Sequence, residues 1–183
     1  RHCKNLEGMS KPPHIALLGC GYWGKNLVRN LHELRALQLV CDPAESGRTA
    51  AAENAPGVAT SSDFNDALKS DDIKAVAIAT PAETHFELVS SVLKAGKDVF
   101  VEKPLALQVS EGEQLKDLAQ KRGCILMVGH LLEYHPAVVR LRELIDAGEL
   151  GNVNYIYSNR LNFGKVRTEE NALWSFAPHD VAV

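Results

Sequence analysis

Three glycines with the spacing Gly-x-Gly-x-x-Gly lie near the start of the chain, at Gly19, Gly21 and Gly24. They follow an apolar run, residues 15–18, and precede apolar residues at helical spacing, as expected for a strand, a tight turn and a helix. Gly19 would permit the turn, Gly21 would let a pyrophosphate approach the backbone, and Gly24 would let the helix pack closely on the strand. Free N–H groups and the positive end of the helix dipole would hold the anion. The spacing therefore predicts a dinucleotide site.

An acidic residue stands where such a site would meet the adenosine ribose. Asp42 follows the apolar run 39–41 and lies eighteen residues beyond Gly24. A carboxylate there accepts hydrogen bonds from a ribose diol and repels a 2′-phosphate, so NAD is expected in preference to NADP. Tyr22 and Trp23 could cover the cofactor, although Trp23 could equally pack on the helix face. The alternative is an ordinary strand–loop–helix turn followed by a fortuitous acid.

Strand-like and helix-like segments alternate along most of the chain, which is the pattern of a parallel α/β sheet. Short apolar runs predict six strands, at residues 15–18, 39–41, near 58, 75–79, 99–101 and 124–128. Helices are expected between them. Ser46 would cap one helix, and a capping box, Ser110-x-x-Glu113, would open another that ends at Gly123. The predicted fold class is α/β, with a doubly wound Rossmann sheet.

Ligands of a doubly wound sheet bind beyond the carboxyl ends of its strands. Further marked segments stand at such ends, namely Thr80-Pro81, Glu102-Lys103-Pro104 and Gly129-His130. Together with the glycine turn and Asp42 they would line one crevice. A lysine in this place can hydrogen-bond a reacting oxygen, and burial lowers the pKa of an ammonium group and makes it a usable proton carrier. Pro104 biases Lys103 away from helical angles, which helps to aim its side chain inward.

The pattern changes from His135 onward. A helix is expected from Pro136 to about Ala147, and residues 153–163 then alternate between apolar and polar, as in a half-buried antiparallel strand. We expect a disordered N-terminal extension at residues 1–12, a Rossmann dinucleotide-binding domain at 13–151 and the truncated start of an α+β substrate and oligomerisation domain at 152–183. Because an independent sheet needs about three strands, the chain is interpreted as a fragment of a longer protein.

The composition argues against several classes of function. The 183 residues are 45% hydrophobic and 23% charged, with a formal net charge of −3 and no basic run, so neither nucleic acid nor an anionic membrane is an expected partner. The sequence shows no apolar run of membrane length and no signal-peptide core in residues 1–10. The four cysteines lack the spacing of a metal or redox motif. A cytoplasmic protein with reduced thiols and no metal site is therefore expected.

The order of these motifs resembles the Gfo/Idh/MocA family of nicotinamide-dependent oxidoreductases. The resemblance rests on the glycine motif, Thr80-Pro81-x-x-x-His85, Glu102-Lys103-Pro104 and a later run, Trp174-Ser-Phe-Ala-Pro-His179-Asp180. It covers about residues 13–183 and implies a hydride transfer between NAD(P) and a ring hydroxyl or ketone of a sugar, nucleotide sugar or cyclitol. The run 173–180 is similar to that of bacterial members that oxidise nucleotide sugars, which suggests a substrate of the UDP-N-acetylglucosamine type. The full-length protein would be a homo-oligomer.

The resemblance also implies roles for particular residues. Lys103 and His179 would act as acid and base toward the proton of the reacting hydroxyl, and the Lys103 ammonium would stabilise the developing alkoxide. Glu102 would orient Lys103 or contact the nicotinamide ribose. The Thr80-Pro81 segment and His85 would lie near the cofactor, although a histidine in the first turn of a helix is as often a simple surface residue.

Substrate would contact His130, Ser175 and His179 in addition to Lys103. Many family members have an aspartate where this chain has Ser175, four residues before His179. A hydroxyl can still bind substrate, but it supplies no negative charge to raise the basicity of the histidine. Packing or capping is the alternative role for His130.

A hypothesis from another class is a non-catalytic, NAD(P)-binding regulatory or structural protein. Such a protein needs the glycine turn but no proton-transfer pair, so Lys103 and His179 argue against it. The fragment itself could bind a dinucleotide and still turn over nothing, because most of the substrate-facing sheet would be missing.

Overall fold

The computed structural model describes residues 14–159, 177 and 180–182. They belong to two compact units, one that ends at Val128 and one that begins at Gly129. The boundary expected between residues 151 and 152 concerns the domains of the whole protein and stays a prediction. The N-terminal extension expected at residues 1–12 lies outside the described residues.

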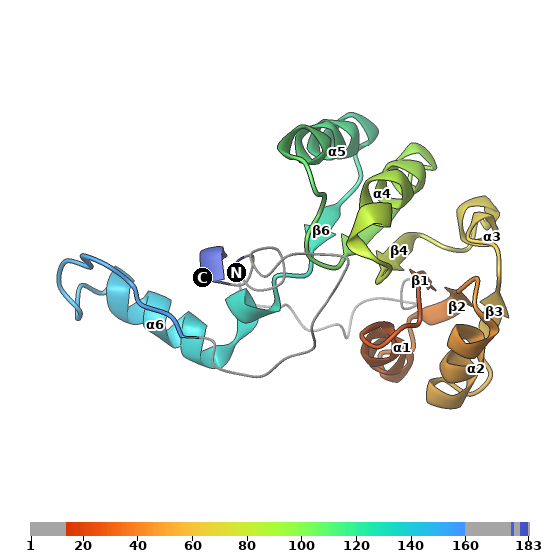
Figure 1. The fold of residues 1–183 in the computed structure, drawn as a ribbon, viewed down its shortest axis with the longest axis horizontal. Helices are drawn as coiled ribbons and strands as arrows, with labels where there is room; N and C mark the ends of the chain where they lie inside the picture. Colours follow the sequence, from red (N-terminus) through yellow and green to blue (C-terminus); the bar gives the residue numbers. More distant parts are fainter. Residues whose placement is uncertain (1–13, 160–176, 178–179, 183) are drawn as a thin grey trace. The chain divides into compact units, whose positions relative to one another are not determined.

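Within the described residues, the first unit contains a six-stranded sheet in which every neighbouring pair of strands is parallel. Its strands are β1 (Ile15–Leu18), β2 (Leu37–Cys41), β3 (Ala59–Ser61), β4 (Ala75–Ile78), β5 (Asp98–Val101) and β6 (Leu126–Val128). Their order is β3-β2-β1-β4-β5-β6, so the winding direction reverses between β1 and β4 (Figure 1). This is the doubly wound Rossmann arrangement, which confirms the predicted fold class.

Helices cover both faces of this sheet (Figure 1). One face carries α1 (Gly24–Glu33) and α2 (Glu45–Asn54), and the other carries α3 (Asn65–Lys69), α4 (His85–Lys94) and α5 (Val109–Arg122). Adjacent strand residues serve opposite faces: Leu17 packs in a cluster with Val28 of α1, whereas Leu18 packs in a cluster with Leu93 of α4. Because both faces are buried, the central strands β1 and β4 are continuously apolar, which is why their positions could be predicted.

Two helix starts differ from the prediction. Helix α2 begins at Glu45, so Ser46 lies inside the first turn and caps nothing; the N-cap position is Ala44. Helix α5 does begin with a capping box, but it is formed by Gln108 and Glu111 rather than by Ser110 and Glu113. The extended backbone of Gln108, with φ −123° and ψ 142°, makes it the cap. Gly123 ends α5 in the left-handed conformation, with φ 68°, as predicted.

The second unit contains a short 3-10 helix, η3 (Leu131–Tyr134), followed by α6 (Pro136–Asp146). Pro136 lies in the first turn of α6, as expected, and Nδ1 of His135 caps the helix by accepting the N–H of Ala137 at 3.2 Å. The half-buried strand expected from residue 153 is absent from residues 153–159, which are exposed and form no ladder. A strand needs a partner for its hydrogen bonds, and none pairs with this segment in the described part of the chain.

Of the helices in the described ranges, none combines the length and the apolar character that a membrane crossing requires.

Candidate cofactor-binding site

The glycine loop joins β1 to α1 at the carboxyl edge of the sheet. Gly19 has φ +86°, and a Cβ there would lie 2.9 Å from the carbonyl oxygen of Ala79 at the end of β4. A Cβ on Gly24 would overlap the carbonyl oxygen of Gly19, so close packing of the turn requires glycine at both positions. Gly21 differs, because it is exposed and nothing lies within 4 Å of where its Cβ would be. The open side of the loop is therefore at Gly21, where the pyrophosphate is predicted to bind.

Asp42 follows β2 directly and is only 9% exposed. Its Oδ2 accepts the N–H of Cys20 in the glycine loop at 2.7 Å, and its Oδ1 accepts the N–H of Ala44 at 2.9 Å. The carboxylate thus ties the glycine loop to the start of α2, a structural role that the sequence interpretation missed. The predicted contact with a ribose diol stays a prediction, and a carboxylate that accepts two hydrogen bonds still has acceptor sites for it.

Position 47 in α2 requires glycine, because a Cβ there would overlap the carboxyl group of Asp42. Gly47→Ala is therefore expected to lower Tm, even though alanine in a helix is normally more stable than glycine by about 0.5–1 kcal/mol. To make room, Asp42 must give up hydrogen bonds that, as bonds to a charged group, contribute about 1.5–3 kcal/mol each.

Gly112→Ala in α5 is the matched control for this prediction. The nearest atom to its Cβ would be Cδ2 of Leu105 at 3.9 Å, an ordinary contact, so this variant should raise Tm. Thermal melts of both variants make the comparison. An increase in Tm for Gly47→Ala equal to that for Gly112→Ala would contradict the role of Gly47.

A pocket of about 380 Å³ opens where the winding direction reverses. It is lined by the ends of β1 and β2 and by residues that directly follow β3 and β4, and it includes five predicted cofactor residues: Gly19, Gly21, Asp42, Thr80 and Pro81. Phe64 and Leu88 add apolar wall, so the pocket combines an apolar surface with a few polar groups, as sites for small ligands usually do. The position matches the general rule for open α/β sheets, in which ligands bind beyond the carboxyl ends at this switch point.

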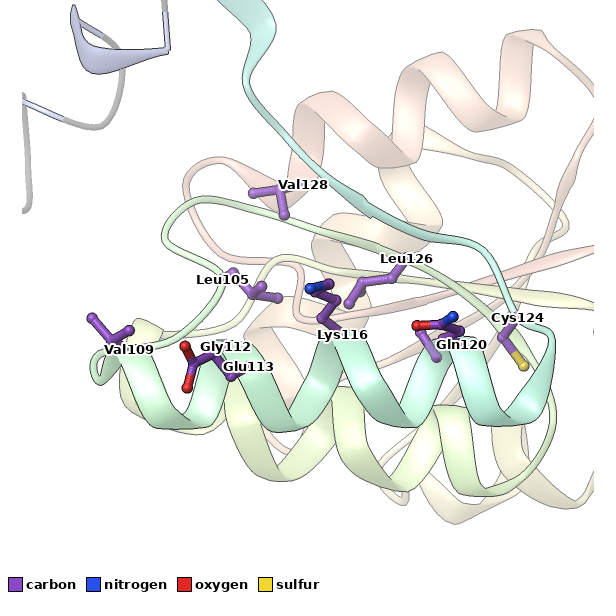
Figure 2. A pocket seen from close by; sticks show the side chains of 10 residues that line it. Leu105, Val109, Gly112, Glu113, Lys116, Gln120, Cys124, Leu126 and Val128 are labelled. Carbon is purple, nitrogen blue, oxygen red and sulfur yellow. The ribbon is translucent and has the colours of Figure 1, made fainter.

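A larger hollow of about 660 Å³ lies between α5 and β6 (Figure 2). Figure 2 shows the side chains of Leu105, Val109, Leu126 and Val128 around it, with Lys116 of α5 beside them. None of the predicted cofactor or catalytic residues lines this hollow. The pocket at the glycine loop is therefore the candidate site.

The segment Glu102-Lys103-Pro104 leaves the sheet at the carboxyl end of β5. The N–H of Glu102 donates to the carbonyl of Ile78 at 2.9 Å, so the segment is anchored to the end of β4. Lys103 is half-buried, and the peptide bond between Lys103 and Pro104 is cis. The indole Nε1 of Trp23 donates to Oε1 of Glu102 at 2.6 Å. The glycine loop and the lysine loop are thus joined by a side-chain hydrogen bond between residues 79 positions apart.

Burial raises the pKa of Glu102 above its ordinary value of 4.5, although the Trp23 hydrogen bond and the neighbouring Lys103 lower it in part. The folded protein therefore binds this proton more tightly than the unfolded chain does. The stability that results is fully present below the unfolded pKa and is lost as the pH rises through the folded pKa. Glu102 thus makes the fold less stable near neutral pH than in acid.

Glu102→Gln should consequently raise Tm at pH 7 and change it less at pH 4. The amide oxygen of the glutamine can still accept the indole N–H of Trp23. Melts of both proteins across this pH range test the expectation, with the exposed Glu83→Gln as the control. The same difference in Tm at both pH values would contradict it.

His85 begins α4, after the short 3-10 helix η2 (Ala82–Thr84). It is 1% exposed, so the alternative of a surface histidine is wrong. Its Nδ1 lies 2.6 Å from the carbonyl oxygen of Pro104, and its Nε2 lies 2.9 Å from that of Thr80. His85 therefore joins two of the loops predicted to hold the cofactor, while its own contact with the cofactor stays a prediction.

Of the remaining predicted residues, the structure describes Tyr22 and His130 but not Ser175 and His179. Tyr22 is 82% exposed beside the glycine loop, and its contact with the cofactor stays a prediction. His130 belongs to the second unit, where its Nδ1 is buried without a hydrogen-bond partner among the described residues. Ser175 and His179 lie outside the described residues, and their roles stay predictions. No group of three metal-ligating side chains occurs in the part of the chain that the structure describes.

A family model for oxidoreductases with an NAD-binding Rossmann fold, GFO_IDH_MocA, matches residues 14–130. The chain belongs to the Gfo/Idh/MocA family. The match begins at the residue before β1 and ends at His130, so it contains the glycine loop, Asp42, His85 and the Glu102-Lys103-Pro104 segment. The resemblance inferred from these motifs is confirmed.

Two curated proteins are each similar to most of this chain. It is 35% identical over 147 residues to the 2,7-anhydro-N-acetylneuraminate hydratase of Mediterraneibacter gnavus, covering 79% of this chain and 38% of the relative. It is 35% identical over 154 residues to the scyllo-inositol 2-dehydrogenase (NAD(+)) of Bacillus subtilis, covering 80% and 44%. The chain spans less than half the length of each of these relatives.

Solved structures of similar proteins include two that hold the cofactor. GenD2 from gentamicin A biosynthesis, in complex with NAD, has a TM-score of 0.72 and 32% identity, covering 77% of this chain and 41% of that one. The scyllo-inositol dehydrogenase of Lactobacillus casei, with bound NAD(H) and scyllo-inositol, has a TM-score of 0.72 and 25% identity, covering 78% and 43%.

Proposed function

We propose that this chain is the dinucleotide-binding part of an NAD(P)-dependent dehydrogenase that acts on CH–OH groups. The observation that carries the proposal is the convergence of the glycine loop, Asp42 and the Glu102-Lys103-Pro104 segment at one edge of the sheet, linked by the hydrogen bonds of Cys20 to Asp42 and of Trp23 to Glu102. The residues fit a dinucleotide, because the loop is open at Gly21 and closely packed at Gly19 and Gly24. NAD is the proposed cofactor, since the Asp42 carboxylate would repel a 2′-phosphate.

The proposed substrate is a ring hydroxyl or ketone of a sugar, nucleotide sugar or cyclitol. Support for a cyclitol comes from the relatives that are inositol dehydrogenases. A nucleotide sugar of the UDP-N-acetylglucosamine type rests on the run 173–180 alone. We also propose a cytoplasmic location, consistent with the free thiols of Cys20, Cys41 and Cys124, and a homo-oligomeric full-length protein.

The side chains of the protein would transfer one proton to or from the reacting hydroxyl. When bound, the nicotinamide accepts or supplies the hydride. Lys103 would hydrogen-bond the reacting oxygen and stabilise its negative charge as the hydroxyl proton leaves, and His179 would take up that proton. Glu102 would hold Lys103 in place through its carboxylate. The roles proposed for these three side chains require no metal ion.

The whole protein, supplied with NAD and a panel of cyclitols, sugars and nucleotide sugars, tests the proposal through the absorbance of NADH at 340 nm. Reduction of NAD with one of these classes is the expected result, and NADP should support a rate at least about tenfold lower. If NADH binds but no member of the panel is oxidised or reduced, the non-catalytic regulatory protein becomes the better hypothesis.

A further inference from the structure

The ring of His85 meets a carbonyl oxygen at each of its two nitrogens. The oxygen of Pro104 lies 2.6 Å from Nδ1, and the oxygen of Thr80 lies 2.9 Å from Nε2. The ring is 1% exposed, so water does not replace either partner. Both distances are those of formed hydrogen bonds.

This pairing has a consequence for the protons on the ring. A carbonyl oxygen can only accept a hydrogen bond, and a neutral imidazole has one N–H and one lone pair. In either neutral tautomer, one nitrogen would therefore place its lone pair against an oxygen lone pair in a buried site. Only the imidazolium form, in which both nitrogens carry a proton, donates to Pro104 and Thr80 at once.

A carboxylate is at hand to balance such a charge. Glu102 stands two residues before Pro104, and a positive charge on His85 favours its ionised form. The cation in the same loop is Lys103, which also interacts with Glu102. Glu102 therefore interacts with both groups, and its third partner is the indole of Trp23.

We propose that His85 is a positioning residue that holds the Lys103-Pro104 loop against the Thr80-Pro81 loop by donating a hydrogen bond to a carbonyl oxygen in each. Thr80 and Pro81 line the cofactor pocket, and Lys103 directly precedes the residue whose carbonyl His85 holds. The ring thus fixes the lysine loop relative to the pocket wall. The importance of this positioning for catalysis rests on the proposed function, in which Lys103 acts on the substrate. The two hydrogen bonds that His85 donates do not depend on that function.

The double donation is tested by nitrogen NMR of the chain with ¹⁵N-labelled histidine, assigned through the backbone of α4. At pH 8 a histidine in water is neutral, because its ordinary pKa is about 6.5. Both ring nitrogens of His85 should nevertheless show the chemical shifts of protonated nitrogen, while the exposed His32 serves as the internal reference. A spectrum in which one nitrogen of His85 is unprotonated would overturn the proposal.

The positioning role is tested in the whole protein with His85→Gln, in which a single amide nitrogen replaces the two ring nitrogens and the other polar atom, an oxygen, cannot donate to a carbonyl. We expect kcat to fall by about tenfold to a hundredfold, as for a catalytic group displaced by about 1 Å, with a smaller change in KM. Val89→Ala, a buried substitution in the same helix, should lower Tm without changing kcat at a temperature where both variants are folded. A loss of Tm in His85→Gln with kcat unchanged would make the residue merely structural and overturn the role.

These two experiments also separate this inference from the proposed function. If the whole protein has no dehydrogenase activity, the proposed function fails, and the NMR measurement still decides whether His85 donates to both loops. If His85→Gln does not fold, His85→Asn replaces it in the kinetic measurement, with the same expected and contradicting results.

Discussion

Gly21→Ala is expected to weaken the binding of NADH to this chain by about a hundredfold or more while changing Tm by less than about 2 °C. Nothing lies within 4 Å of the Cβ that the substitution adds, and the φ angle of Gly21 is not in the left-handed region, so the fold should accept alanine. The same methyl group would occupy the space that a pyrophosphate needs to reach the backbone N–H groups. A loss of this size corresponds to about 2.8 kcal/mol of binding free energy. Fluorescence titration with NADH and thermal melts measure the two quantities.

Gly24→Ala is the contrasting variant, because it should fail in a different way. Its Cβ would overlap the carbonyl oxygen of Gly19, so the turn cannot close around it. We expect a large decrease in Tm, with the loss of NADH binding following from the loss of the fold. If Gly21→Ala bound NADH as tightly as the unchanged chain, the pyrophosphate would not lie on this loop, and the candidate site would be wrong.

The sheet could be predicted because its central strands are buried on both faces. Residues such as Leu17 and Leu18 face opposite helical layers, so β1 and β4 are continuous apolar runs with a clear beginning and end. The same runs predict where a ligand would bind, since the carboxyl ends of parallel strands share one edge, and the candidate pocket lies at that edge. Local sequence patterns were therefore sufficient to predict the parallel sheet and the edge at which the candidate site lies.

Contacts between distant residues could not be predicted in this way. The bond from Trp23 to Glu102 and the two bonds of His85 join segments that meet only in the folded sheet. The role of Asp42 in holding Cys20 was missed for the same reason, although Gly47 in the first turn of α2 was an available signal. A helical glycine often marks a close approach by another group.

The wrong predictions arose where a local pattern had more than one solution. Both Gln108–Glu111 and Ser110–Glu113 have the spacing of a capping box, and the backbone conformation of Gln108 decides between them. The alternation after residue 152 shows which residues would share a face of a strand, but a strand also requires a neighbour. Periodicity describes the segment alone and says nothing about that neighbour.

Lys103→Met in the whole protein is expected to lower kcat by about a thousandfold while the Kd for NADH changes by less than about threefold. The substitution removes the ammonium group that would hydrogen-bond the reacting oxygen, and the loss of such a group typically costs between about a hundredfold and ten-thousandfold in rate. It leaves the glycine loop and Asp42 in place, so cofactor binding should persist. Stopped-flow or steady-state kinetics and a fluorescence titration provide the two measurements.

Lys97→Met is the matched control, because the two lysines stand at opposite ends of β5. Lys97 precedes the strand and is buried, and its Nζ donates to the carbonyl oxygens of Ser70 and Ile73, each at 2.7 Å. Its loss should lower Tm and leave kcat unchanged at a temperature where the variant is folded. The amino end of a parallel strand supports the fold, and the carboxyl end carries the chemistry. Equal effects of the two substitutions on kcat would show that Lys103 also serves only the fold.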